Sequence, residues 1–212
     1  MDSSTLRDDL YLLAHDDAGK PLAHRTTLSI GLASALLADL ALAGRIDLID
    51  GRVVVSDPGP VGEQFADRAV QAVLSLRNRH TPQTWIGWLA EDAYERVRGA
   101  LLASGTLNRT TVRRLGLIPT TRFRPTNQEA MVLAHARARY AVLGLEQPDA
   151  RTAALCALLA VLRLESSVYV NAPTTEVHDR LTQIAAANHP TIQQLIAAAD
   201  TAAASASVAL YR

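Results

Sequence analysis

The chain has 212 residues, of which 49% are hydrophobic and only 4% aromatic, so it can bury a core that must be built mainly from aliphatic side chains. Its 21 basic and 21 acidic residues cancel, which excludes non-specific adhesion of the whole surface to nucleic acid or to a membrane. The single cysteine, Cys156, excludes an internal disulfide, and we expect it to be a small core residue.

Apolar residues recur at helical spacing along most of the chain, which favours a mainly α-helical fold. We expect a cap at Thr26 or Thr27 and a left-handed stop at Gly44 for the second helix, and a capping box of Thr126 with Glu129 for the sixth. In chain order, the predicted helices cover residues 5–14, 26–44, 63–79, 82–92, 92–104, 126–144, 148–169, 174–187 and 191–209.

Two segments between these helices predict β-hairpins. The first, near residues 45–56, alternates apolar and polar residues around Asp50-Gly51, a dipeptide suited to a turn in which both residues need positive φ. The second, near residues 107–124, is longer and rich in β-branched and turn-forming residues. Because no stretch has the composition of a linker, we expect one globular helical domain over residues 1–212, with two β-hairpins.

Signatures of catalysis and of metal binding are absent from the sequence. It has no phosphate-binding glycine loop, no nucleophile elbow and no cysteine pair, so we expect no enzymatic activity, no cofactor and no metal. The adjacent acids Asp8 and Asp9 are interpreted as part of a solvated turn. The histidines are scattered and are expected at the surface or at helix caps: His15, His24, His80, His135, His178 and His189.

The N-terminal residues lack the basic start and apolar stretch of a signal peptide, and no run of about 18 apolar residues is evident in the sequence. We therefore expect a cytoplasmic protein. Lys20 is the only lysine beside 20 arginines, and alanine is abundant. This composition is typical of GC-rich codon usage and favours a bacterial origin.

Positive charge is concentrated in one segment of this otherwise balanced chain. From Arg96 to Gln128 there are seven arginines and no aspartate or glutamate. Because the planar guanidinium donates two hydrogen bonds at once to a phosphate, this segment predicts an anion-binding surface. The hairpin residues that we expect to contact a membrane or a second subunit are Arg113, Arg114, Leu115, Leu117, Ile118, Arg122, Phe123 and Arg124.

Three kinds of partner fit this basic and apolar hairpin, and spacing alone does not separate them. In the first, apolar side chains enter a lipid interface while arginines meet anionic headgroups. In the second, the hairpin is the wing of a winged-helix-like protein, whose arginines contact the backbone of a nucleic acid. In the third, the hairpin is covered by another subunit, with the arginines at the rim of the interface.

The stretch TPQTWIGWLAED, residues 81–92, resembles a hallmark segment of the Golgi phosphoprotein 3 family, which are peripheral membrane proteins that bind phosphatidylinositol 4-phosphate. LYLLAHDDAGK resembles the opening helix and turn of that family, and IGLASALLADLALAGRIDL resembles its second helix. VRGALLASGTL is similar to the helix before its hairpin, and RTAALCALLAVL to a late core helix. The resemblance follows the order of the family over nearly the whole chain.

The resemblance implies a mostly helical, non-catalytic domain. It also implies a hydrophobic hairpin for membrane insertion and self-association, and a basic pocket for an inositol phosphate headgroup. At the positions of the family's pocket residues this chain has His24, Ala33, Glu91 and Tyr94. The headgroup candidates in this chain are therefore His24 and the nearby Arg25, Arg96 and Arg98.

These observations lead to one expected function with two alternatives. We expect a peripheral protein on the inner membrane face that binds anionic lipid, including phosphoinositides, through the hairpin and the adjacent pocket, and that can form a homo-oligomer through the hairpin. A winged-helix-like nucleic-acid-binding protein is the less favoured alternative. A structural oligomer without lipid function is the other.

Overall fold

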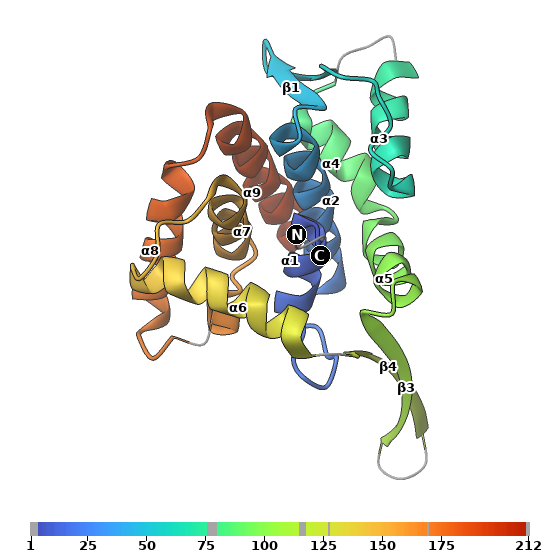
Figure 1. The fold of residues 1–212 in the computed structure, drawn as a ribbon, viewed down its shortest axis with the longest axis vertical. Helices are drawn as coiled ribbons and strands as arrows, with labels where there is room; N and C mark the ends of the chain where they lie inside the picture. Colours follow the sequence, from blue (N-terminus) through green and yellow to red (C-terminus); the bar gives the residue numbers. More distant parts are fainter. Residues whose placement is uncertain (1–3, 76–79, 115–117, 127, 169, 211–212) are drawn as a thin grey trace.

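Helices dominate the computed structural model, which describes residues 4–75, 80–114, 118–126, 128–168 and 170–210 (Figure 1). This architecture confirms the predicted mainly α-helical fold with two β-hairpins. The helices are α1 (Leu6–Leu13), α2 (Arg25–Leu42), α3 (Gln64–Ser75), α4 (Pro82–Ala90), α5 (Ala93–Ala103), α6 (Gln128–Leu143), α7 (Ala150–Val161), the 3₁₀ helix η1 (Glu165–Val168), α8 (Thr174–Ala186) and α9 (Pro190–Leu210). The strands are β1 (Ile46–Ile49), β2 (Arg52–Val55), β3 (Leu107–Arg114) and β4 (Ile118–Pro125).

The starts of the first two helices are set by side chains that cap free backbone N–H groups. Thr5 and Asp8 form a reciprocal capping box at α1. At α2 the predicted threonine cap is wrong, because the cap is His24, whose Nδ1 accepts a hydrogen bond from the Thr26 N–H at 3.3 Å. Gly44 ends this region with φ of 67°, as predicted.

The first hairpin has the turn that its sequence predicts. Asp50 has φ of 52° and Gly51 has φ of 70°, so both turn residues are in the left-handed region. Ile46 pairs with Val55 and Ile49 pairs with Arg52 in the antiparallel ladder.

The predicted helix over residues 148–169 is divided in two in the structure. Asp149 caps α7, and Arg163 adopts φ of 55° just after the helix ends. The Arg163 and Leu164 N–H groups then donate to carbonyls of the last turn of α7, which closes the helix before η1 begins. No glycine marks this stop, so the end of α7 could not be located from the residue types alone. Residue 127, directly before α6, lies outside the described residues, and the predicted Thr126–Glu129 capping box stays a prediction.

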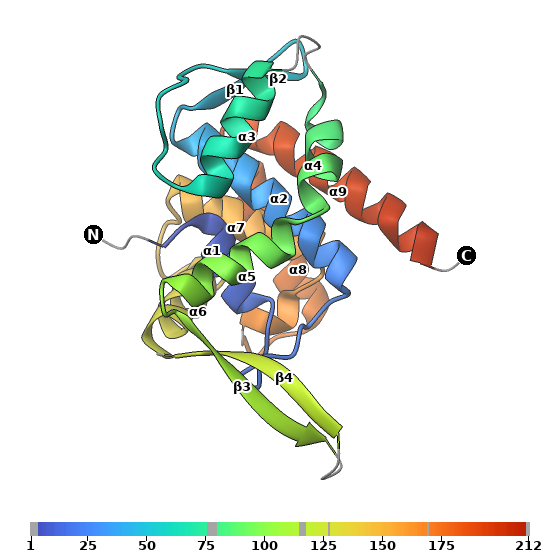
Figure 2. The same cartoon turned by 90° about the vertical axis from the view of Figure 1, so that its right-hand side faces the viewer.

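Helix α2 lies at the centre of the fold and packs against α1, α4, α5, α7 and α9 (Figures 1 and 2). Residues 30–38 are all buried, and most of them are leucine or alanine. Gly31 permits a close approach, because a Cβ there would lie 2.4 Å from the Leu162 Cδ1. The predicted aliphatic core is therefore built around one helix, and Cys156 is fully buried in the same core.

By length and composition α2 could cross a membrane, which corrects the expectation that no such segment exists in the chain. Its residues are mostly buried by the surrounding helices, and Ser34 satisfies its hydroxyl within the helix by donating to the Ile30 carbonyl at 2.8 Å. The position of α2 inside the bundle is that of a core helix of a globular domain.

Asp9 is buried rather than solvated, which corrects its interpretation as part of an exposed turn. Its Oδ2 lies 2.8 Å from the Arg151 Nη2 and 3.6 Å from the Arg137 Nη1. Burial raises the pKa of Asp9, although both guanidinium groups act to lower it. The carboxylate thus ties α1 to α6 and α7, and its charge is balanced within the protein.

Asp9→Ala should lower the free energy of unfolding by about 2 kcal/mol, because it leaves Arg137 and Arg151 beside an empty site. The value is below that of a fully buried pair because both arginine side chains are 28% exposed. Urea denaturation followed by circular dichroism measures the change, with Asp200→Ala on the exposed face of α9 as the control. Equal stabilities of the two variants would contradict a structural role for the Asp9 ion pairs.

The second hairpin extends away from the helices, beyond the end of α5 (Figures 1 and 2). Its strands pair from Leu107 with Pro125 to Arg114 with Ile118, and an eight-residue strand spans about 25 Å. The base is fixed to the body, since Leu107 is buried and Phe123 packs against the core. Residues 115–117, which include the predicted contacts Leu115 and Leu117, lie outside the described residues.

Candidate functional site

Two of the four headgroup candidates meet at one place, where the start of α2 lies beside α5. Arg25 and Arg98 both form ion pairs with the carboxylate of Glu95. Both guanidinium groups also lie against the ring of Tyr94, at 4.8 Å for Arg25 and 5.7 Å for Arg98. These distances are within the range of cation–π attraction. We call these four residues the arginine–tyrosine cluster.

The chain geometry explains why the cluster forms. Glu95 and Arg98 are three residues apart on α5, and Tyr94 and Arg98 are four apart, so their side chains share one face of the helix. Arg25 is the first residue of α2 and approaches that face from a different segment of the chain. Its side chain is 57% exposed, whereas that of Arg98 is 22% exposed, so one arginine of the cluster is open to solvent.

A buried histidine, His15, fixes the position of the Tyr94 ring through the tyrosine hydroxyl. The His15 Nδ1 lies 2.7 Å from the Tyr11 carbonyl, and its Nε2 lies 2.7 Å from the Tyr94 hydroxyl. Because only a protonated Nδ1 can donate to a carbonyl, a neutral His15 donates a hydrogen bond to the Tyr11 carbonyl and accepts one at Nε2 from the Tyr94 hydroxyl. Burial lowers the pKa of His15, which favours that neutral form.

His15 was expected at the surface or at a helix cap, and its burial corrects that expectation. The signal that could have located it is its spacing from Tyr11, four residues earlier, because the two rings stack at 4.2 Å between centroids. His15 thus supports Tyr94, the aromatic residue of the arginine–tyrosine cluster, and is buried away from solvent.

The other two headgroup candidates, Arg96 and His24, do not join the ion pairs of the cluster. Arg96 lies on a different face of α5, where its Nε donates to the Asp92 carboxylate at 2.5 Å and its guanidinium lies 5.6 Å from the Phe65 ring centroid. His24 is exposed and is used as the cap of α2.

Arg98 connects the cluster to the base of the hairpin. Its guanidinium carbon lies 4.2 Å from the ring centroid of Phe123 on β4. The backbone at Phe123 is held by the loop before α2, since a Cβ at Gly19 would lie 2.0 Å from the Phe123 carbonyl oxygen, and Gly19 has φ of 71°. Phe123 is therefore a packed residue at the root of the hairpin, while the tip lies at the far end of the ladder.

The ladder distributes the hairpin residues over two faces. Phe123 pairs with Arg109, and these two residues share one face because directly paired side chains point the same way. Arg122 and Arg124 flank Phe123 in sequence and so lie on the opposite face. The expected contact residues thus do not make one patch, and Arg109 joins the hairpin arginines on the side of Phe123.

The residues at the positions of the family's pocket differ in how far they are buried, and they do not form one pocket in this chain. Ala33 is fully buried within α2, whereas Tyr94 is the floor of the arginine–tyrosine cluster. Glu91 is exposed and lines a separate cavity beside α3 and α4. Of these aligned positions, only Tyr94 lies at the arginine–tyrosine cluster, where it contacts Arg25 and Arg98.

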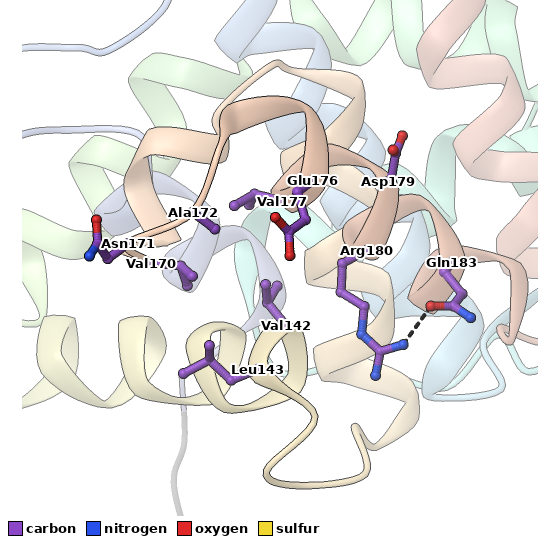
Figure 3. A pocket seen from close by; sticks show the side chains of 10 residues that line it. All are labelled: Val142, Leu143, Val170, Asn171, Ala172, Glu176, Val177, Asp179, Arg180 and Gln183. Atoms are coloured by element: carbon purple, nitrogen blue, oxygen red, sulfur yellow. Dashed lines mark hydrogen bonds between the residues drawn. The ribbon is translucent and has the colours of Figure 1, made fainter.

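A cavity of about 610 Å³ lies away from the sequence-predicted residues, between the end of α6 and the start of α8 (Figure 3). Glu176 points into the cavity. The apolar part of its lining consists of Val142, Leu143, Val170, Ala172 and Val177. The Arg180 guanidinium donates a hydrogen bond to the neutral side chain of Gln183 at 2.5 Å. The lining also carries the carboxylates of Glu176 and Asp179, whose negative charge disfavours an anionic headgroup. The described histidines, cysteines and acids do not form a group of three that could hold a metal ion.

Comparison with known protein families places the chain in one of them. The family model described as Golgi phosphoprotein 3 (GPP34) matches residues 6–206, nearly the whole chain. No curated protein matches the chain. The matched range includes every helix of the bundle except the end of α9, and both hairpins.

Proposed function

This chain belongs to the Golgi phosphoprotein 3 family, and from that premise we propose that it is a non-catalytic peripheral membrane protein that binds anionic lipid. In this proposal the arginine–tyrosine cluster binds the phosphate of a headgroup, and the tip of the second hairpin enters the lipid interface. The inner face of the cytoplasmic membrane is the proposed location. Phosphoinositides are included among the anionic lipids.

The observation that carries the proposal is the convergence of Arg25 and Arg98 on one carboxylate. The Glu95 carboxylate is paired with two guanidinium groups that both lie against the Tyr94 ring. The same two guanidinium groups could donate hydrogen bonds to the oxygens of a phosphate. A lipid phosphate carries more oxygen acceptors than a carboxylate and can take the place of Glu95. The floor below it, Tyr94 on His15, is already fixed.

The second hairpin supports a membrane partner because its base contacts the arginine–tyrosine cluster. Arg98 contacts Phe123 at the hairpin base, so a headgroup bound at the cluster lies beside the root of the projecting ladder. The arginines of the ladder then meet neighbouring headgroups, each contributing about 1 kcal/mol near an anionic leaflet. Self-association through the same hairpin is a second contact that we propose for this surface.

Nucleic-acid binding is the less favoured function because the exposed face of α5 is not basic. A winged-helix protein places the helix before its wing in a groove, where exposed basic and polar side chains contact phosphates and bases. The exposed residues of α5 include Glu95, Gly99 and Ala100, while Arg96 and Arg98 are engaged with acids. This helix therefore lacks the open basic face that the alternative requires.

Glu95→Gln should raise the affinity for anionic vesicles by about fivefold, because the neutral amide frees both guanidinium groups while keeping the side-chain shape. Vesicle co-sedimentation over a range of lipid concentrations measures the change. Glu176→Gln is the matched control, since it removes one exposed negative charge far from the cluster. An equal rise in both variants would mean that only net charge matters, and would count against Glu95 as the group that a lipid phosphate displaces.

A further inference from the structure

A second cavity, of about 310 Å³, is lined by α3 and by the junction of α4 and α5, and it includes none of the residues of the arginine–tyrosine cluster. Its floor is apolar, because Phe65 and Leu89 are both buried. Its volume is at the lower end of the range for small-molecule sites. The lining residues are Phe65, Arg68, Trp88, Leu89, Glu91 and Asp92.

One wall of this cavity is suited to an organic cation. Trp88 is 42% exposed, and its ring stands edge-on to the buried Trp85 at 5.7 Å between centroids. Beside Trp88, the side chain of Glu91 forms no hydrogen bond or ion pair with the described residues. An exposed indole with a nearby carboxylate is the usual setting for binding an ammonium or guanidinium group.

The protein already holds one cation in this way next to the cavity. Arg96 lies over the ring of Phe65 at 5.6 Å and donates from Nε to Asp92 at 2.5 Å. Trp88 and Glu91 repeat this combination of aromatic ring and carboxylate, but neither has a cationic side chain against it within the described residues. The wall formed by Trp88 and Glu91 is therefore open to a cation from outside.

The part of the lining that α3 contributes is suited to an anion. Arg68 projects from α3, is exposed, and has no ion-pair partner in the part of the chain that the structure describes. Because Arg96 balances Asp92, the remaining charges of the lining are one positive on Arg68 and one negative on Glu91. A purely anionic ligand would be repelled by Glu91, and a purely cationic ligand would be repelled by Arg68.

We propose that this cavity binds a phospho-ammonium zwitterion, the group found in phosphocholine and phosphoethanolamine. The ammonium lies against Trp88 and Glu91, and the phosphate is bound by Arg68, which can donate two hydrogen bonds to it. The same group occurs free in solution and as the headgroup of zwitterionic lipids. For a ligand of about a dozen non-hydrogen atoms, we expect a Kd of about 1 mM. This site does not depend on the hairpin or on the arginine–tyrosine cluster.

The two tryptophans make the test direct, because a ¹⁵N-labelled chain has only two indole N–H signals, and Trp88→Phe identifies one of them. We expect phosphocholine or phosphoethanolamine to shift the Trp88 signal saturably, and choline alone or inorganic phosphate alone to bind at least about tenfold more weakly. Glu91→Gln and Arg68→Gln should each weaken binding of the zwitterion about tenfold. Glu146→Gln, an exposed acid after α6, is the control and should change nothing.

Three results would overturn this proposal. The first is the absence of a saturable shift with either zwitterion. The second is tight binding of choline that Arg68→Gln leaves unchanged. The third is preferential binding of N-acetyl-argininamide, which would make the wall a site for a basic protein side chain. Competition by phosphatidylcholine vesicles indicates a lipid source, and its absence a soluble one. Leu117→Glu should leave the soluble titration unchanged, which separates this site from the proposed membrane function.

Discussion

Leu117→Glu should lower the affinity for anionic vesicles by about 100-fold. Leu117 lies outside the described residues, and in the sequence it stands between the paired residues Arg114 and Ile118, where we propose that the chain enters the lipid. Partial insertion of a leucine contributes about 2 kcal/mol, and a negative charge in its place adds repulsion of about 1 kcal/mol near an anionic leaflet. Together these effects correspond to the expected loss.

The matched control for this change is Leu145→Glu, because Leu145 is 66% exposed and lies after α6, away from the hairpin. It makes the same substitution without touching the proposed contact surface. Phe123→Glu is a poor substitute for either variant, since Phe123 packs at the hairpin base under Arg98 and its loss would disturb the fold. Unchanged vesicle binding by a folded Leu117→Glu chain would rule out insertion of the tip.

The double variant Arg25→Gln with Arg98→Gln should lower the affinity for anionic vesicles by about 30-fold. Each basic residue near an anionic leaflet contributes about 1 kcal/mol, and the variant also leaves Glu95 unbalanced beside the membrane. Co-sedimentation measures the loss, and circular dichroism checks that the helices are retained. With phosphoinositide in the vesicles the loss should be larger, because the cluster is the proposed phosphate site.

The comparison for the double variant is Arg139→Gln with Arg180→Gln, which removes two positive charges from α6 and α8. If both double variants lose the same affinity, binding depends on net charge alone and the cluster has no special role. If the Arg25 and Arg98 variant binds as tightly as the wild-type chain, the headgroup does not contact the cluster.

Local signals in the sequence predicted most of the fold. Helical spacing and the Asp50-Gly51 turn depend on residues close in sequence, so α-helices and the first hairpin could be located without a structure. The division between α7 and η1 could not, because it depends on a non-glycine residue, Arg163, in the left-handed region. The histidine cap of α2 is another local choice for which the common cap residues were the better expectation.

The site was predictable only in part. Arg25 and Arg98 are far apart in sequence, and only the packing of α2 on α5 brings them to one carboxylate. The separation of Arg96 from Arg98 could have been predicted, because residues two apart on a helix lie on different faces. The burial of Asp9 depends on arginines from α6 and α7, and no pattern near Asp9 indicates them.

The measurement that tests the proposed function most directly is co-sedimentation of the wild-type chain with three kinds of vesicle: neutral, generally anionic, and anionic with phosphatidylinositol phosphates. The account predicts binding to both anionic kinds at least about 30-fold tighter than to neutral vesicles, decreasing as salt rises. A preference for the third kind would place phosphoinositide at the arginine–tyrosine cluster. Failure to bind either anionic kind would contradict the proposed membrane function, and nucleic acid and protein partners would then be the alternatives to test.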